Sequence, residues 1–192
     1  MRIVGGELKG RKLQAPADGR VRPTSDRIRE ALFNVLAHGN FGAFSLSGAR
    51  VLDLFAGTGA LGLEALSRGG SFALFVDEDA TSRGLIRTNA EALGVTGLTK
   101  IYRRDATKLG PRNASAGPPF DLVFADPPYG KGFGAKALAE LLTGDWLSAH
   151  AIVVLEEDKS TDLPVPPGFV ELDRRTYATT QVLIMGLASD AT

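Results

Sequence analysis

The sequence predicts an α/β fold: a doubly wound, seven-stranded mixed sheet with a small N-terminal extension. From Arg50 onward, short runs rich in β-branched and aromatic residues alternate with helical segments. Such alternation is typical of a parallel sheet that is covered by helices on both faces. After Glu157 the alternation stops, and residues 170–188 look like two strands with no helix between them. A terminal hairpin of this kind would make the sheet mixed.

The elements are expected in the following order. Residues 2–16, RIVGGELKGRKLQAP, alternate short apolar and polar stretches around glycines and predict a hairpin. Thr24 or Ser25 is expected to cap a helix that carries apolar residues on one face, namely Ile28, Leu32, Val35 and Leu36. Residues 38–48 form a loop into the main sheet. Further strands are expected at residues 49–55, 71–77, 98–104, 120–126 and 151–157, and a helix at 61–69 with Leu61, Leu63 and Leu66 mostly inward.

Composition excludes several classes of site. The 192 residues include no cysteine, which rules out disulfides and thiolate metal ligands, and only two histidines, so we expect no metal site. No apolar run approaches 18 residues and no signal-peptide pattern opens the chain, so a soluble cytoplasmic protein is expected.

The neutral formal charge hides a basic block. Residues 1–29 carry a net charge of +5, with eight basic and three acidic side chains. The basic ones are Arg2, Lys9, Arg11, Lys12, Arg20, Arg22, Arg27 and Arg29. A block of this kind suits a partner with a phosphate backbone, although a solvated surface would look the same.

A strand, a glycine turn and a helix are predicted at residues 51–66, VLDLFAGTGALGLEAL. Gly57 and Gly59 permit a tight turn and close approach of a ligand to the backbone. The spacing with Gly62 matches G-x-G-x-x-G, and Asp77 ends the next strand twenty residues on, where its carboxylate could bind ribose hydroxyls. These features alone leave an NAD-dependent dehydrogenase as a serious competitor.

Two further acids bear on that competitor. Asp53 lies four residues before Gly57, where a carboxylate would repel a pyrophosphate but would suit a cationic amine, such as that of S-adenosylmethionine. It could instead simply cap the turn. Asp105, after the third strand, is placed to accept the amino group of an adenine, or equally to cap a helix.

Residues 120–130, FDLVFADPPYG, describe an apolar strand that ends on a stiff corner. Proline cannot continue a strand ladder, so Asp126 and Tyr129 are held at the carboxyl end of the strand, where open parallel sheets bind ligands. Asp-Pro-Pro is also ordinary turn chemistry, and the corner alone does not separate the two interpretations.

Together these segments resemble a known family. The ordered motifs DLFAGTG, FVDED, RRDA and DPPY resemble those of class I methyltransferases that act on exocyclic amines. The segments RIVGGELKGRKL, RPTSDRIREALFNVL and DPPYGKG are similar to one branch, the RsmD family of bacterial 16S ribosomal RNA guanine-N2 methyltransferases. The resemblance spans nearly the whole chain, and the RPTSDRIREALFN block is specific to that branch.

The resemblance implies a Rossmann-like domain at residues 49–192 with an RNA-binding hairpin and helix at residues 1–48. It implies catalysis by Asp126, Pro127, Pro128 and Tyr129 without a metal. The implied S-adenosylmethionine site comprises Thr24, Asp53, Phe55, Gly57, Gly59, Asp77, Asp105 and Ala106. The implied RNA contacts are Arg2, Lys9, Arg11, Lys12, Arg22 and Arg27.

Asp126 and the carbonyl oxygen of Pro127 could accept both N–H bonds of the guanine amine in a tetrahedral arrangement, which favours the transition state over the planar amine. Tyr129 could stack on the base.

Rival functions remain. A DNA adenine-N6 methyltransferase would use the same corner, a dehydrogenase is opposed by Asp53, and a silent RNA-binding module is opposed by the complete set of site residues. The expected partner is 16S rRNA in an assembled or assembling small subunit, and a monomer is expected. The sequence determines neither the target nucleotide nor whether naked RNA suffices. The loop 38–49 and the segment after 158 have no evident role.

Overall fold

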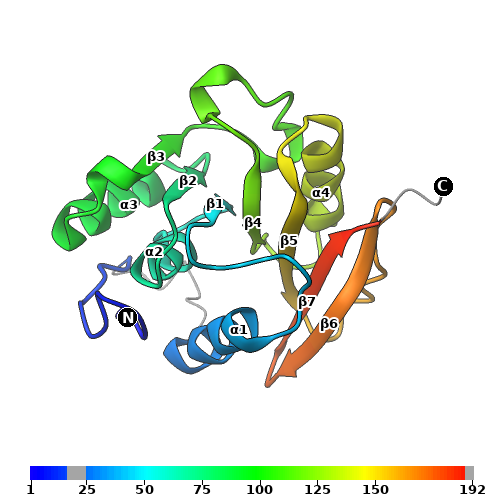
Figure 1. The fold of residues 1–192 in the computed structure, drawn as a ribbon, viewed down its shortest axis with the longest axis horizontal. Coiled ribbons are helices and arrows are strands. Elements are labelled where there is room, and N and C mark those ends of the chain that lie inside the picture. Colours follow the sequence, from blue (N-terminus) through cyan, green and yellow to red (C-terminus); the bar gives the residue numbers. More distant parts are fainter. Residues whose placement is uncertain (17–24, 189–192) are drawn as a thin grey trace.

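The structure, a computed structural model, describes residues 1–16 and 25–188. Its seven-stranded sheet has the order β3-β2-β1-β4-β5-β7-β6 (Figure 1). The strands are β1 (Arg50–Leu54), β2 (Phe72–Val76), β3 (Thr99–Tyr102), β4 (Phe120–Ala125), β5 (Leu147–Asp158), β6 (Phe169–Tyr177) and β7 (Thr180–Leu187). The first five strands pair in parallel, and β7 lies antiparallel between β5 and β6. The predicted α/β class and the mixed, seven-stranded sheet are both confirmed.

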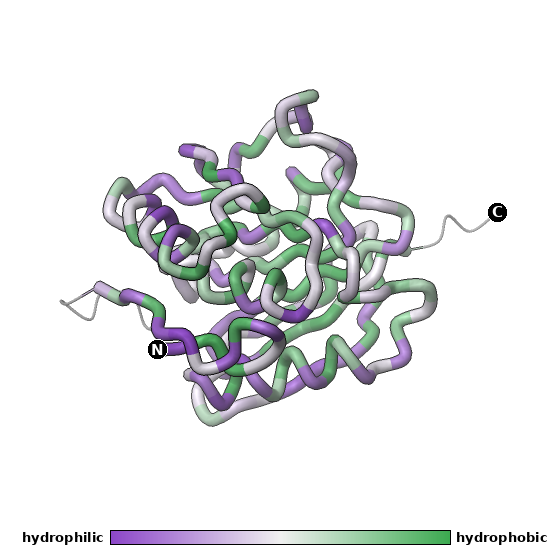
Figure 2. The backbone as a smooth tube through the Cα atoms, turned by 60° about the vertical axis from the view of Figure 1, so that its left-hand side comes forward, coloured by the Kyte–Doolittle hydropathy of each residue, from purple (hydrophilic) through white to green (hydrophobic). Residues whose placement is uncertain are grey.

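Helices cover both faces of the sheet. One apolar cluster contains residues of α1 (Asp26–His38), α2 (Ala60–Ser67) and α3 (Ala80–Leu93), while a second contains residues of α4 (Phe133–Thr143). Short 3-10 turns lie at η1 (Thr96–Leu98), η2 (Ala106–Lys108) and η3 (Ala114–Ala116). Figure 2 shows hydrophobic residues concentrated in the interior of the molecule, with many hydrophilic residues toward its outside. Within the described residues, no helix is long and apolar enough to span a membrane.

The N-terminal segment folds back on itself, as the hairpin prediction requires, but through one isolated antiparallel bridge between Arg2 and Lys12. Ile3 and Leu13 belong to the same apolar cluster as the central strands. The backbone N–H of Val4 donates to Glu64 Oε2 in α2 at 2.8 Å. The segment is therefore packed on the sheet domain through a shared core, and the division near residue 48 stays a prediction.

The buried face of helix α1 shares Leu32 and Leu36 with the expected one but is rotated toward Arg29 and Phe33. Ser25 caps it, with Oγ accepting from the Ile28 N–H at 3.2 Å. The buried residues are Arg29, Leu32, Phe33 and Leu36, whereas Ile28 and Val35 are only partly buried. The spacing of this stripe, i, i+3, i+4 and i+7, is that of an ordinary helix face whose first position is a charged residue.

Arg29 can occupy that position because acids surround it. Its Nη2 donates to Asp26 Oδ1 at 2.9 Å, and also to the carbonyl oxygen of Arg2, while its Nε lies 3.5 Å from Glu64 Oε2. Glu64 is itself fully buried and accepts a further bond, at 2.8 Å, from Arg68. Arg29 therefore joins the extension to the domain and contributes nothing to a basic surface.

Candidate functional site

Asp53, which the sequence predicts at the site, and Glu156, which it does not, lie at one edge and on one face of the sheet. Asp53 in β1 and Glu156 in β5 each lie two residues beyond a strand residue, Val51 and Val154, that packs in the cluster beneath α1. Because side chains alternate along a strand, Asp53 and Glu156 face the same side as these two residues. The carboxyl ends of β1 and β4 are neighbours in the sheet, so the glycine turn and the corner after β4 adjoin.

The turn after β1 is held by Asp77, the acid that ends β2. Asp77 Oδ2 accepts from the Gly57 N–H and Oδ1 from the Asp79 N–H, both at 2.8 Å. Phe55, Gly57 and Gly59 all have positive φ, of 57°, 56° and 76°. A phenylalanine with positive φ is strained, and such strain occurs mainly where the surroundings fix the backbone at functional sites.

Gly62, the third glycine of the G-x-G-x-x-G spacing, lets α2 pack closely against β2. A Cβ at Gly62 would lie 2.4 Å from a ring atom of Phe75. Asp53 Oδ2 accepts the Gly62 N–H at 2.9 Å, so this carboxyl caps the start of α2. Burial raises the pKa of Asp53 to about 8, opposed by the Gly62 bond and supported by repulsion from Asp77. Capping and an additional ligand contact are compatible, because no described residue donates to its other oxygen.

Asp105 takes the capping role that the sequence left open. Its Oδ1 accepts from the backbone N–H of Thr107 at 2.8 Å and from the Thr107 hydroxyl at 2.7 Å. The hydroxyl bond is the main reason why the pKa of Asp105 lies below its ordinary value. Ala106, the first residue of η2, is buried. A role for Asp105 or Ala106 in binding adenine stays a prediction.

The corner after β4 is anchored by two acids of β5 that sequence reasoning missed. Pro127 is buried and Pro128 exposed. The hydroxyl of Tyr129 donates to Glu156 Oε1 at 2.8 Å, and the N–H of Gly130 donates to Glu157 Oε1 at 3.1 Å. Glu156 and Glu157 lie near the carboxyl end of β5, the strand that pairs with β4. Two adjacent acids near the end of a predicted strand were the sequence signal that could have indicated their role at the site.

Asp126 differs from the other acids in its surroundings. Burial, reinforced by repulsion from Glu156, Asp53 and Glu157, raises its pKa well above the ordinary value. Burial also raises the pKa of Tyr129. Among the residues that the structure describes, none donates a hydrogen bond to the Asp126 carboxyl. The described residues thus leave this group able to accept hydrogen bonds from a ligand.

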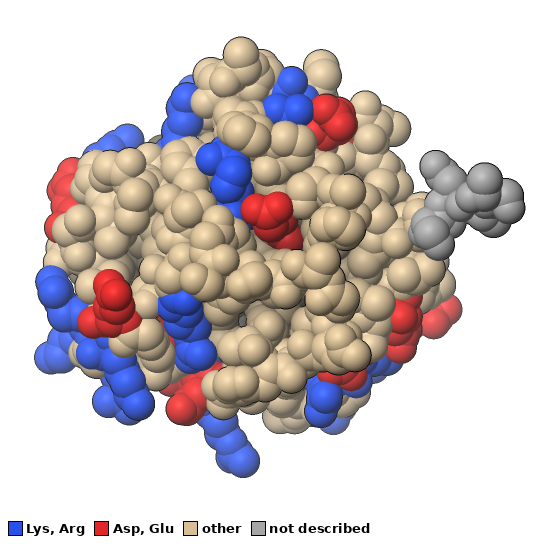
Figure 3. All heavy atoms as spheres, viewed as in Figure 1, with Lys and Arg blue, Asp and Glu red and all other residues tan. Residues whose placement is uncertain are grey.

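The residues predicted to contact RNA are mostly exposed. Lys9, Lys12 and Arg27 lie at the surface. Arg2 lies 3.5 Å from Asp26 with a mostly exposed side chain, and Arg11 donates to the carbonyl oxygen of Ala92. Figure 3 shows basic side chains gathered on the side of the molecule where the N-terminal segment lies. The predicted residues Thr24 and Arg22, with Arg20, lie outside the described residues.

The site suits a cofactor that carries both hydroxyls and a cationic amine. The positive-φ glycine turn and the carboxyls of Asp77 and Asp53 lie at one end, and beside them lies the carboxyl of Asp126, to which no described residue donates. In the part of the chain that the structure describes, no group of three or more His, Asp or Glu side chains is arranged to hold a metal ion.

Comparison with known proteins gives the family. The family model described as "Conserved hypothetical protein 95" matches residues 1–186. The chain belongs to this family, the RsmD family. It is 37% identical over 179 residues to the Escherichia coli protein named "Ribosomal RNA small subunit methyltransferase D", covering 93% of this chain and 85% of that protein. It is 38% identical over 186 residues to the Bacillus subtilis protein named "Putative rRNA methyltransferase YlbH", covering 96% and 97%.

Solved structures agree with this membership. The fold superposes on the structure named "Putative methyltransferase yhhF from Escherichia coli" with a TM-score of 0.83, at 29% identity and 99% coverage of both chains. The predicted membership of the RsmD family and the methyltransferase type of the fold are thus confirmed.

Proposed function

We propose that the protein transfers a methyl group from S-adenosylmethionine to the exocyclic N2 amine of a guanine in 16S rRNA. The observation that carries the proposal is the Asp126 carboxyl, which is unpaired among the described residues and adjoins the glycine turn of an RsmD-family chain. The relatives named small-subunit rRNA methyltransferases support the substrate, and the family supports guanine N2. The protein would act in the cytoplasm, as a monomer, on the small ribosomal subunit.

The residues of the corner account for the chemistry required. A guanine amine is planar because its lone pair is delocalised into the ring. Two acceptors, the Asp126 carboxylate and the Pro127 carbonyl oxygen, would favour the tetrahedral nitrogen that forms as the methyl group arrives. The raised pKa of Asp126 makes its carboxylate a stronger base for the proton that the amine releases. The cofactor supplies an electrophilic methyl group when bound.

Tyr129 would position the base. Its ring would stack on the guanine, and its hydroxyl is fixed by Glu156 in β5. Asp53 would accept the cationic amine of the cofactor and Asp77 its ribose hydroxyls, with Phe55, Gly57 and Gly59 forming the turn around it. Lys9, Lys12, Arg11, Arg2 and Arg27 would bind RNA phosphates.

The decisive experiment is transfer of labelled methyl groups from S-adenosylmethionine to small subunits that lack the modification, followed by nucleoside analysis. We expect N2-methylguanosine at one position, and a rate of labelling about 10²–10³-fold lower with Asp126→Ala as the matched control. If DNA is offered in place of the subunits, label in N6-methyladenine would establish the alternative function, a DNA adenine-N6 methyltransferase. Calorimetry that showed binding of NAD and none of S-adenosylmethionine would overturn the cofactor assignment.

The salt dependence of RNA affinity tests whether the N-terminal basic residues contact RNA phosphates. Replacing Lys9, Arg11 and Lys12 together by alanine should weaken RNA binding and reduce the slope of log affinity against log salt by about 0.7–0.9 per lost phosphate contact. Cofactor affinity should not change, because these residues lie in the N-terminal segment. An unaltered salt slope would show that the three side chains form only a solvated surface.

A further inference from the structure

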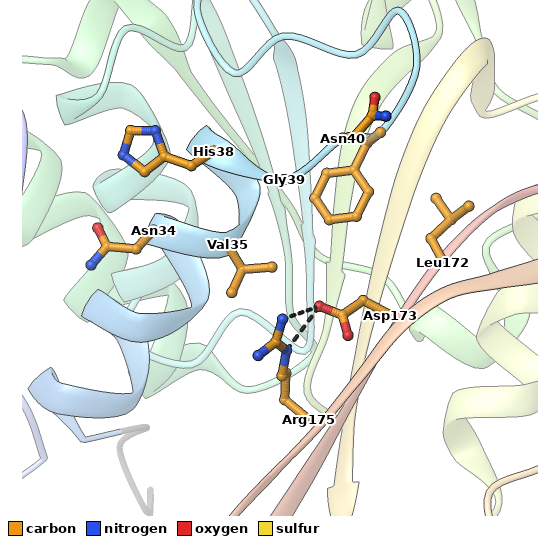
Figure 4. Close-up of a pocket in the computed structure, with 9 residues that line it drawn as sticks. Asn34, Val35, His38, Gly39, Asn40, Leu172, Asp173 and Arg175 are labelled. Atoms are coloured by element: carbon orange, nitrogen blue, oxygen red, sulfur yellow. Dashed lines mark hydrogen bonds and ion pairs between the residues drawn. The ribbon is translucent and has the colours of Figure 1, made fainter.

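An open hollow of about 490 Å³ lies between the end of α1 and the edge strand β6 (Figure 4). Its lining comes from two segments far apart in the sequence: Asn34, Val35, His38, Gly39, Asn40 and Phe41 from the first, and Leu172, Asp173 and Arg175 from the second. These segments overlap the loop 38–49 and the region after residue 158, for which no role is evident from the sequence. The fold thus unites the two unassigned parts of the chain at one place.

The strand register places this hollow beside the catalytic corner. Val182 of β7 pairs with Glu156 of β5 on one side and with Arg175 of β6 on the other. Residues paired in this way share a face of the sheet. Because neighbouring strands lie about 4.8 Å apart, the Cα atoms of Arg175 and Glu156, two strands apart, lie about 10 Å from each other. Glu156 holds Tyr129. The hollow therefore lies on the face of the sheet to which Glu156, the residue that holds Tyr129, also belongs.

The charges of the hollow largely cancel. Arg175 donates through Nε to Asp173 Oδ2 at 2.8 Å, and its Nη2 lies 2.8 Å from the same oxygen. Figure 4 shows the two side chains joined between α1 and β6. A guanidinium paired in this way is a poor site for a phosphate, which would have to compete with the carboxylate. The hollow accordingly favours a neutral ligand over an anion.

The remaining lining suits a planar, polar ligand. Phe41 offers an aromatic ring, and the position of that ring depends on Gly39, since a Cβ there would lie 2.5 Å from it. Leu172 and Val35 add apolar contact, and the exposed amides of Asn34 and Asn40 can both donate and accept. Stacking on an aromatic ring combined with edge hydrogen bonds is how proteins recognise unpaired RNA bases.

We propose that this hollow binds an unpaired base of the RNA substrate close to the methylated guanine, and so contributes to the choice of target. The inference rests on the proposed function. It assigns base recognition to Phe41 with Asn34 and Asn40, and it leaves phosphate binding to the N-terminal segment. The other occupant to consider is a protein strand added to β6, where Val170 and Leu172 are 43% and 42% exposed.

Two sets of variants test the inference on unmodified small subunits: Phe41→Ala, and the double variant Asn34→Ala with Asn40→Ala. Because losing one stacked base typically weakens binding by roughly tenfold or more, Phe41→Ala should raise KM for the subunit about tenfold while kcat changes little. The double variant, at exposed positions, should act in the same direction without affecting folding. Val170→Ala, on β6 but outside the hollow, is the matched control, and its KM and kcat should equal those of the wild-type protein.

Chemical probing of the RNA in the enzyme–subunit complex identifies the occupant. The unmodified protein and Val170→Ala should protect a base near the methylated guanine, and Phe41→Ala should leave that base reactive. Unchanged KM and protection in both variants would overturn the inference, as would a raised KM with no base newly exposed, which would indicate a protein partner. If the unmodified protein transfers no methyl group to any small-subunit RNA, the proposed function itself fails, and that result is distinct.

Discussion

The acids at the carboxyl edge of the sheet form two groups that differ in what already binds them. Around the glycine turn, Asp53, Asp77 and Asp105 each accept at least one backbone N–H from a loop or helix start. At the corner after β4, Asp126 has acids as its neighbours and, among the described residues, no donor. The first group uses its hydrogen bonds to fix the shape of the turn, whereas the described residues leave the Asp126 carboxyl available to a ligand.

The difference separates two kinds of functional residue. An acid that organises the backbone should affect stability and ligand binding together, because both depend on the same hydrogen bonds. An acid held among other acids costs the folded protein something to ionise, so its removal should affect only the chemistry. Substitutions at the two groups should therefore give opposite patterns of stability and activity.

The largest effect is expected at Asp126. Asp126→Ala removes an acceptor that acts on the transition state, so kcat should fall by about 10²–10³-fold, similar to losing one oxyanion-hole donor. The melting temperature should not fall, because a carboxyl with an unfavourable environment has been removed and both prolines remain. Parallel measurements of methyl transfer and thermal unfolding check both statements. A well-folded variant with near-normal methylation would show that Asp126 and the two prolines only form a turn and that Asp126 takes no part in catalysis.

The next effect is expected at Asp77 and should have the opposite pattern. Asp77→Ala leaves the N–H groups of Gly57 and Asp79 without their acceptor, and such a loss costs about 1–3 kcal/mol. Stability should therefore fall along with cofactor affinity. Asp77→Asn, which keeps one acceptor oxygen, should lose less of each. Calorimetry and thermal unfolding of both variants provide the measurement, and a loss of affinity at unchanged stability would contradict an organising role.

These two groups also show what the sequence could predict. Alternating strands and helices, the glycine spacing and the strand-end acids Asp53, Asp77 and Asp126 were predictable, because each depends on local pattern. The ion pairs of Arg29 and Glu64 were not, since they depend on which face of α1 meets α2, although the spacing of Arg29 with Leu32 and Leu36 was visible. Glu156 and Glu157 reach the corner only through the register of β4 with β5, and sequence does not determine that register.

A smaller effect concerns the pH dependence of methylation. Glu156 contributes the largest charge repulsion that raises the pKa of Asp126, and Glu157 a smaller one. If methylation requires the Asp126 carboxylate, activity should fall as pH decreases through this raised pKa. Glu156→Gln removes a negative charge, lowers the pKa of Asp126 and should shift the acidic limb of the kcat profile to lower pH. Glu157→Gln should shift it less, and an equal or opposite ranking would show that another group controls the limb.

The smallest effect is expected at the Tyr129 hydroxyl, which belongs to neither group but connects the corner to β5. Stacking requires only the ring, so Tyr129→Ala should slow methylation far more than Tyr129→Phe. The phenylalanine variant loses one hydrogen bond to Glu156, a change of about 0.5–1.5 kcal/mol, so a loss of roughly two- to tenfold in kcat/KM is expected. Glu156→Gln retains an acceptor for the hydroxyl, so it should leave kcat/KM at high pH closer to normal than Tyr129→Phe does. If Tyr129→Phe has no effect while Tyr129→Ala abolishes methylation, the ring alone positions the base and Glu156 acts only through its charge on Asp126.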